Sequence, residues 1–145
     1  MVNYWVKKRE ILKIGLIVFV ASLLVMYIAM GKYSDILSRS NVSDGFIVDA
    51  GVFSFITSIL FVLLFLILRK IKKKYLRVLI QLMVLNAMWL FCNYCLFKNY
   101  HSCWSTYTFD EELFYTVFYS ILPMIIISIL LILVINKLKL QNYEE

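Results

Sequence analysis

The sequence predicts an all-α integral membrane protein, a four-helix bundle with both termini in the cytoplasm. Of its 145 residues, 63% are hydrophobic, and the mean hydropathy is +0.84, too apolar for a soluble domain of this size. Four apolar runs each approach the length of about 20 residues that a helix needs to cross a bilayer. A short basic segment, residues 69–77, separates the second run from the third. Such loops stay in the cytoplasm during insertion, so this one orients every span.

We expect one membrane domain covering residues 1–145, with spans at about residues 14–30, 50–68, 78–97 and 113–135. The first span follows a basic segment but lacks a small-x-small cleavage site near its end, so we interpret it as a retained span and not a signal peptide. Small residues recur at helical spacing in the first two spans and predict close helix contacts. They are Gly15, Ser22 and Ala29 in the first span, and Gly51, Ser54 and Ser58 in the second.

The charge distribution supports this layout, because twelve of the 15 basic residues fall on the cytoplasmic side. The net charge of +6 sits at the ends of the apolar runs, which is typical of membrane anchoring and not of nucleic-acid binding. The topology determinants are the basic side chains between spans two and three: Arg69, Lys70, Lys72, Lys73, Lys74 and Arg77.

The third span is the most polar of the four. Asn86 and Asn93 lie seven residues apart and share a helix face with Trp89. Amides cannot be left unsatisfied in hydrocarbon, so we expect both to face the bundle and to hydrogen-bond across it. The hydrocarbon centres of the spans contain no Asp, Glu, Lys or Arg, which argues against an ion pump or a proton-coupled transporter.

Cys92-Asn93-Tyr94-Cys95 is the sharpest catalytic motif, and Cys103 follows eight residues later. Some membrane disulfide exchangers carry a Cys-x-x-Cys pair at this depth. Here the pair closes a helix at its C-terminal end, where the dipole disfavours a thiolate, and a second pair is missing, so we do not expect an enzyme. A disulfide from Cys103 to Cys92 or Cys95 is one alternative, and free thiols are the other. His101 fits no zinc spacing and is expected to be an exposed loop residue; no metal or other cofactor is predicted.

Several short segments within residues 69–140 have counterparts in a known family: Arg69-Lys70, Leu90-Phe91-Cys92, Leu113-Phe114-Tyr115, Tyr119-Ser120 and Lys137-Leu138-Lys139. In these segments the chain resembles the immunity proteins that protect bacteria against pore-forming colicins, particularly those of the colicin A type. The resemblance implies a multi-pass protein of the bacterial inner membrane with both termini inside. It also implies binding of the toxin's pore-forming domain, chiefly its hydrophobic helical hairpin, before the channel opens.

Under this interpretation two regions are candidates for partner binding. One is the shared face of Asn86, Trp89 and Asn93; the other is the aromatic outer loop and the start of the fourth span, with Trp104, Tyr107, Tyr115 and Tyr119. We favour an intramembrane contact, because the family recognises a hairpin embedded in lipid. The alternatives are a membrane thiol–disulfide oxidoreductase that uses Cys92 and Cys95, and a small transporter or holin-like protein.

Overall fold

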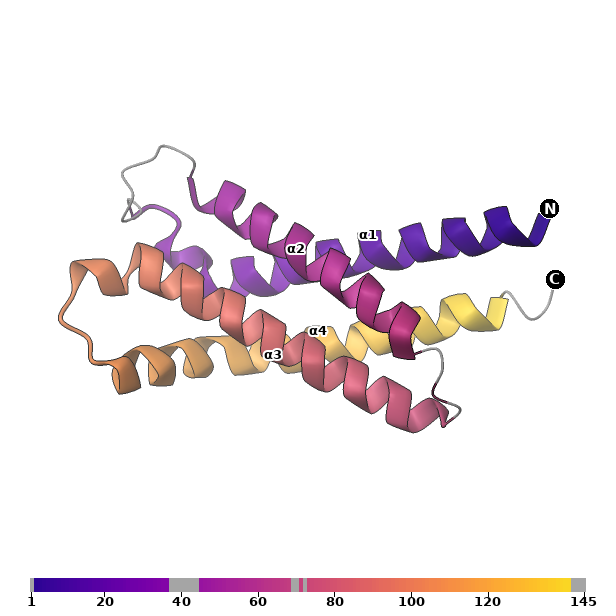
Figure 1. Cartoon of the computed structure of the whole chain (residues 1–145). Helices are drawn as coiled ribbons and strands as arrows, with labels where there is room; N and C mark the ends of the chain where they lie inside the picture. The colour runs from indigo at the N-terminus through magenta and orange to yellow at the C-terminus, as the bar shows by residue number, and fades with distance from the viewer. Residues whose placement is uncertain (1, 37–44, 69–70, 72, 142–145) are drawn as a thin grey trace.

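The computed structural model describes residues 2–36, 45–68, 71 and 73–141, and these residues are helical apart from short connections. The four long helices are α1 (Val2–Met30), α2 (Gly45–Leu68), α3 (Lys74–Tyr100) and α4 (Phe109–Gln141) (Figure 1). Two short 3-10 helices, η1 (Gly31–Tyr33) and η2 (Ser102–Trp104), follow α1 and α3. All four long helices are sufficiently long and apolar to cross a membrane, so the prediction of a helical, multi-pass membrane protein is confirmed.

Each predicted span lies inside a longer helix. α1 begins at Val2 and not near residue 14, and α4 continues to Gln141. A span that is predicted from hydropathy ends where charged residues begin. The helix itself continues further, because backbone hydrogen bonding is maintained through Lys and Arg at the membrane surface. The segments suited to the hydrocarbon region are Ile11–Tyr33, Gly45–Leu68, Tyr75–Tyr100 and Phe109–Val134.

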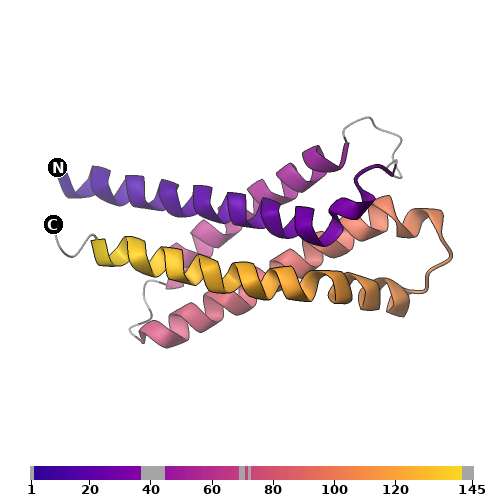
Figure 2. The same ribbon diagram turned by 180° about the vertical axis from the view of Figure 1, so that it is seen from behind.

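The helices run alternately up and down the bundle. The start of α1, the end of α2, the start of α3 and the end of α4 lie at one end, here called the terminal end (Figures 1 and 2). η1 and η2 lie at the opposite end, here called the aromatic end. α1 and α3 each contact the other three long helices. Of the topology determinants, Arg69, Lys70 and Lys72 lie outside the described residues, and Lys73 is exposed at the terminal end.

The core is built around Trp89, which is fully buried and donates a hydrogen bond from Nε1 to Ser22 Oγ of α1 at 2.8 Å. Ser54 and Ser58 are buried in the same region of α2, and Ala29 is buried on α1. These positions confirm that the small residues form helix contacts, because small side chains let two backbones approach closely. Gly51 differs: no atom lies within 4 Å of the position a Cβ would occupy there, so it is not part of a contact.

α4 begins with a capping box. The backbone N–H of Thr108 donates to Glu111 Oε2 at 2.8 Å, and the N–H of Glu111 donates to Thr108 Oγ1 at 3.4 Å. These two bonds satisfy donors that a helix start otherwise leaves without partners. The cap sets where α4 starts, and therefore brings the neighbouring Glu112 and Tyr115 to the aromatic end.

Candidate functional site

The aromatic end takes its name from six rings that pack together and that we call the aromatic cluster. They come from η1, the last turns of α3, the following connection and the start of α4: Tyr33, Phe97, His101, Tyr107, Tyr115 and Tyr119. Offset and edge-to-face pairs of this kind stabilise a packing arrangement beyond the apolar area they bury. The cluster therefore joins η1, which follows α1, to α3 and α4 at one end of the bundle.

His101 lies in the connection after α3, as expected, but its ring is only partly exposed because it packs within this cluster. Its ring stacks on Tyr33, with the centroids 4.4 Å apart, and Nε2 lies 3.2 Å from the Tyr107 hydroxyl. The sequence placed His101 in the outer loop, about four residues beyond the third span; in the structure it directly follows α3, and its imidazole lies over Tyr33 of η1. Burial lowers the pKa of His101, and the nearby positive charge of Lys32 lowers it further.

Lys32 provides a positive charge at the edge of the cluster. Its Nζ lies 3.0 Å from the centroid of the Tyr119 ring and 4.7 Å from that of Tyr33. An ammonium group over an aromatic face is attracted by the negative potential of the ring. Because the Lys32 side chain is exposed, this end of the bundle presents a positive charge that lies over aromatic rings.

A buried carboxylate lies at the same end of the bundle. Glu112 is 8% exposed and accepts hydrogen bonds from the hydroxyls of Tyr94, at 2.9 Å, and Ser102. It borders a polar cavity of about 260 Å³ that also contacts Lys98 and Cys103. Glu112 thus connects α3, η2 and α4 through one side chain, and charge-assisted bonds of this kind are stronger than neutral ones.

The predicted face of Asn86, Trp89 and Asn93 lies inside the bundle, as expected for amides in hydrocarbon. Asn93 is fully buried and donates from Nδ2 to Ser120 Oγ at 3.0 Å. Asn86 Oδ1 accepts a bond from Ser128 Oγ at 3.1 Å. Both asparagines therefore link α3 to α4; Asn86 is half-buried, and the buried Oδ1 of Asn93 has no hydrogen-bond partner among the described residues.

The second predicted region is brought together only in part. Tyr107, Tyr115 and Tyr119 all belong to the aromatic cluster, whereas of Trp104 only the backbone, in η2, is described. The sequence prediction missed three members of the cluster, Tyr33, Phe97 and His101, and the adjacent Lys32. The spacing of Tyr115 and Tyr119 marks one face of α4, but nothing in the sequence indicates that the end of α1 packs over it.

Cys92, Cys95 and Cys103 are free thiols in the structure. Cys92 is buried, with Sγ 3.6 Å from Thr57 Oγ1 of α2, and the Cys103 thiol donates to the Asn99 carbonyl at 3.0 Å. The sequence left open a disulfide or free thiols, and the structure has free thiols that pack as small side chains. Within the described part of the chain, no three His, Cys, Asp or Glu residues are grouped so that they could hold a metal ion.

The environment of His101 predicts a pH dependence. The folded protein protonates this ring less readily than the unfolded chain does, so the unfolded state takes up more protons as the pH falls through about 6.5. Stability is therefore lost below that pH and retained above it. We expect the melting temperature of the detergent-solubilised protein to fall between about pH 7.5 and pH 5, and to fall less in His101→Phe, which keeps a ring but cannot titrate. Equal pH profiles for the two proteins would contradict this assignment.

Known proteins add no relative to this description. No protein-family model matches the chain, and no curated protein or solved structure matches it either.

Proposed function

We propose that this protein is a bacteriocin immunity protein of the bacterial inner membrane, which binds the pore-forming domain of a colicin-like toxin and blocks channel opening. The proposal is one of binding and not of catalysis. It rests on the resemblance of residues 69–140 and on four helices able to span a membrane. The observation that carries it furthest is a row of exposed phenylalanines on α4.

This row, which we call the phenylalanine ridge, consists of Phe114 and Phe118, which lie one helical turn apart on one face of α4. The rings of Phe114 and Phe118 are stacked, with centroids 6.2 Å apart, and each is more than 60% exposed. Behind them, Phe118 contacts Tyr119 and Phe114 contacts Tyr115, so the aromatic cluster supports the ridge from inside. Large aromatic side chains on a rigid support are typical of the residues that dominate binding energy in interfaces.

In the orientation proposed here, the terminal end faces the cytoplasm and the ridge lies in the outer leaflet. A hairpin that a toxin inserts from outside would meet α4 at this depth. Asn93 and Asn86 each bond to a serine of α4 inside the bundle, so the contact would form on the outer surface of α4. This gives the intramembrane contact favoured from the sequence a specific surface, different from the asparagine face.

The function is tested by expressing the protein in sensitive bacteria and challenging them with a panel of pore-forming toxins. We expect protection against at least one toxin, and we expect Phe114→Ala/Phe118→Ala to lose it at unchanged abundance. Removing two hot-spot rings costs about 2 kcal/mol or more, which is roughly a thirtyfold loss of affinity. The measurement is survival against toxin dose, with membrane abundance determined in parallel.

Phe91→Ala is the matched control, because Phe91 is 65% exposed but lies on α3. We expect it to protect like the unmodified protein. An equal loss in this control would mean that exposed aromatic area matters and not the ridge. Protection should also survive replacement of Cys92 and Cys95 by Ser; its loss in folded protein would favour the thiol–disulfide alternative.

The proposed orientation makes a separate prediction. A reporter fused after Glu145 should be active in the cytoplasm, and one inserted at Ser105 should be active outside. Neutralising the basic residues of the segment between α2 and α3 should mix the two orientations. A C-terminal reporter that is active only outside would contradict the orientation without affecting the four-helix fold.

A further inference from the structure

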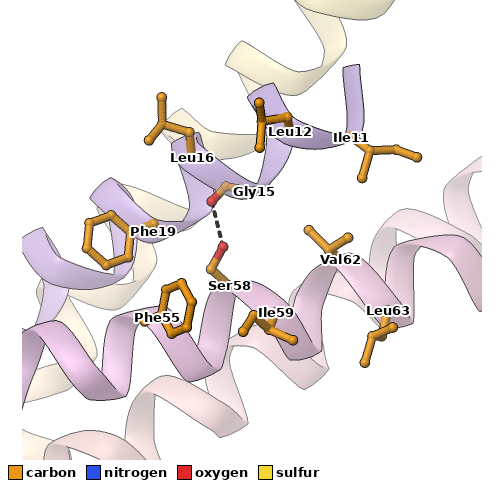
Figure 3. Close-up of a pocket in the computed structure, with 10 residues that line it drawn as sticks. All are labelled: Ile11, Leu12, Gly15, Leu16, Phe19, Phe55, Ser58, Ile59, Val62 and Leu63. Atoms are coloured by element: carbon orange, nitrogen blue, oxygen red, sulfur yellow. Dashed lines mark hydrogen bonds between the residues drawn. The ribbon is translucent and has the colours of Figure 1, made fainter. Parts of the chain in front are cut away.

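An apolar groove and the polar cavity beside Glu112 differ in how far their linings select an occupant. The groove, of about 600 Å³, lies between α1 and α2 beside Gly15 (Figure 3). Its one hydroxyl, that of Ser58, already donates to the Gly15 carbonyl at 2.6 Å, and the other lining side chains are apolar (Figure 3). Such a lining accepts any apolar group. The polar cavity is bordered by charged groups of both signs, so it selects an occupant by charge.

The polar cavity lies between the end of α3, η2 and the start of α4. Its volume of about 260 Å³ corresponds to several water molecules at about 30 Å³ each, so it admits a small polar group. The lining consists of side chains that can donate or accept hydrogen bonds: Lys98, Ser102, Cys103, Ser105, Tyr107 and Glu112. All of them belong to the described part of the chain.

Glu112 gives this cavity a fixed negative charge. Ser102 donates to its Oε1, and Tyr94 donates to its Oε2 at 2.9 Å, so the carboxylate is held in place from two helices. A carboxylate has about four acceptor positions, and these bonds use one on each oxygen. A buried anion is costly when acceptor positions stay empty, and Glu112 is only 8% exposed. The cavity therefore favours a positively charged group with N–H donors at Glu112.

Lys98 gives the edge of the same cavity a positive charge. Its side chain is exposed, and Nζ lies 5.8 Å from the centroid of the Tyr94 ring. In the described part of the chain no ion pair joins Lys98 to Glu112, although both border the cavity. An ammonium group has three donors and no acceptor, so Lys98 is suited to an anion. Two opposite charges that do not neutralise each other match a ligand that carries both.

The depth of the cavity indicates that a lipid headgroup supplies this ligand. Lys98 lies close to the end of the third segment suited to the hydrocarbon region, and Glu112 lies close to the start of the fourth. Such positions are at the level of the headgroups. On α3, Phe91 and Cys95 precede Lys98 at helical spacing. The face that borders the cavity therefore continues to the exposed ring of Phe91, where acyl chains can lie.

We propose that the polar cavity binds a zwitterion with a primary ammonium group and a phosphate, supplied by the headgroup of an ethanolamine phospholipid. The ammonium donates to the free acceptor positions of Glu112, and the phosphate pairs with Lys98. The acyl chains run along α3 past Phe91. This site goes beyond the proposed function, because none of these contacts involves the phenylalanine ridge.

The test is native mass spectrometry of the full-length protein in a mild detergent, with phosphatidylethanolamine, phosphatidylcholine or phosphatidylglycerol of the same acyl chains. We expect one phosphatidylethanolamine to remain bound to most molecules. Phosphatidylcholine has no N–H to donate, and phosphatidylglycerol has no cation. Each should be retained about tenfold less, because a hydrogen bond to a charged group contributes about that factor. Equal retention of the three lipids would overturn the proposal.

Variants of the two charged residues test the two ends of the headgroup. Lys98→Gln, at an exposed position, should lower phosphatidylethanolamine retention about threefold or more, whereas Lys98→Arg keeps the charge and should retain the lipid. Lys32→Gln is the matched control, since Lys32 is an exposed lysine at the same end that does not line the cavity. Glu112→Gln should remove the preference for phosphatidylethanolamine over phosphatidylcholine; should it fail to fold, the Lys98 variants decide. Full retention in Lys98→Gln, or an equal loss in Lys32→Gln, contradicts the assignment.

Glycerophosphoethanolamine, which is the headgroup without acyl chains, distinguishes a lipid from a free zwitterion. At the concentration used for the lipid, we expect it neither to bind nor to raise the melting temperature, since it lacks the contacts along α3. Binding of this soluble compound as strong as that of the lipid would overturn the lipid as the source and assign the cavity to a free zwitterion. All of these measurements are made without a toxin, so this site and the proposed function fail separately.

Discussion

Trp89→Ala is expected to remove most of the folded protein from the membrane. The indole is fully buried at the centre of the bundle, where it contacts the core and bonds to Ser22 of α1. Truncating a buried tryptophan leaves a large cavity and costs about 3–5 kcal/mol, which is comparable to the whole stability of a small domain. The measurement is the amount of monodisperse protein that remains after heating in detergent, together with its abundance in the membrane.

Two variants separate the contribution of the Trp89–Ser22 hydrogen bond from that of the packing of the indole. Ser22→Ala removes the hydrogen bond but little volume, and interhelical bonds in membranes average about 0.6 kcal/mol, so its loss should be small. Phe91→Ala removes an exposed ring from the same helix and should leave the melting temperature nearly unchanged. If Ser22→Ala were as damaging as Trp89→Ala, the hydrogen bond and not the packing would be the source of stability.

Glu112→Leu is expected to detach the start of α4 from the end of α3. The variant loses two hydrogen bonds to a charged acceptor and leaves the hydroxyls of Tyr94 and Ser102 without it. Bonds to a charged group contribute about 1.5 kcal/mol or more each, so the expected loss is about 3 kcal/mol. A lower melting temperature and faster proteolysis of the connection between α3 and α4 would report this loss.

Asp110→Leu is the matched control, because it removes an acid from the same helical turn at an exposed position. It should lose only the favourable interaction with the helix dipole, well under 1 kcal/mol at such a surface. Glu112→Gln keeps an acceptor oxygen without the charge and should fall between the two. Equal losses in Asp110→Leu and Glu112→Leu would mean that the dipole, and not the buried network, determines the stability of this end.

The sequence alone determined the class of fold. In hydrocarbon every backbone polar group must be satisfied within its own segment, so an apolar run of sufficient length is a helix whatever its neighbours are. The same reasoning predicted that Asn86 and Asn93 face inward, because an amide has no partner in lipid, and the structure bears this out. These inferences needed no tertiary information, since the membrane itself imposes the constraint.

Only the tertiary structure decided which apolar residues are core and which are exterior. Phe97 is fully buried and Phe91 is 65% exposed, yet both are phenylalanines in the same apolar run of α3. Lipid is as apolar as a helix interface, so hydropathy does not separate the two faces of a transmembrane helix. The groove beside Gly15 has the same origin, because its lining resembles any lipid-facing surface in sequence.

The sequence likewise does not distinguish buried from exposed polar residues at the aromatic end. Three consecutive acids open α4, and the sequence gives each the same role at a helix N-terminus. Only Glu112 is buried, because helical rotation turns it toward Tyr94 and Ser102 while Asp110 and Glu111 face outward. His101 likewise enters the aromatic cluster through the turn of η2 and the position of η1, which depend on how α1 and α3 pack. Contacts between segments far apart in the chain are set by packing, and no local pattern encodes them.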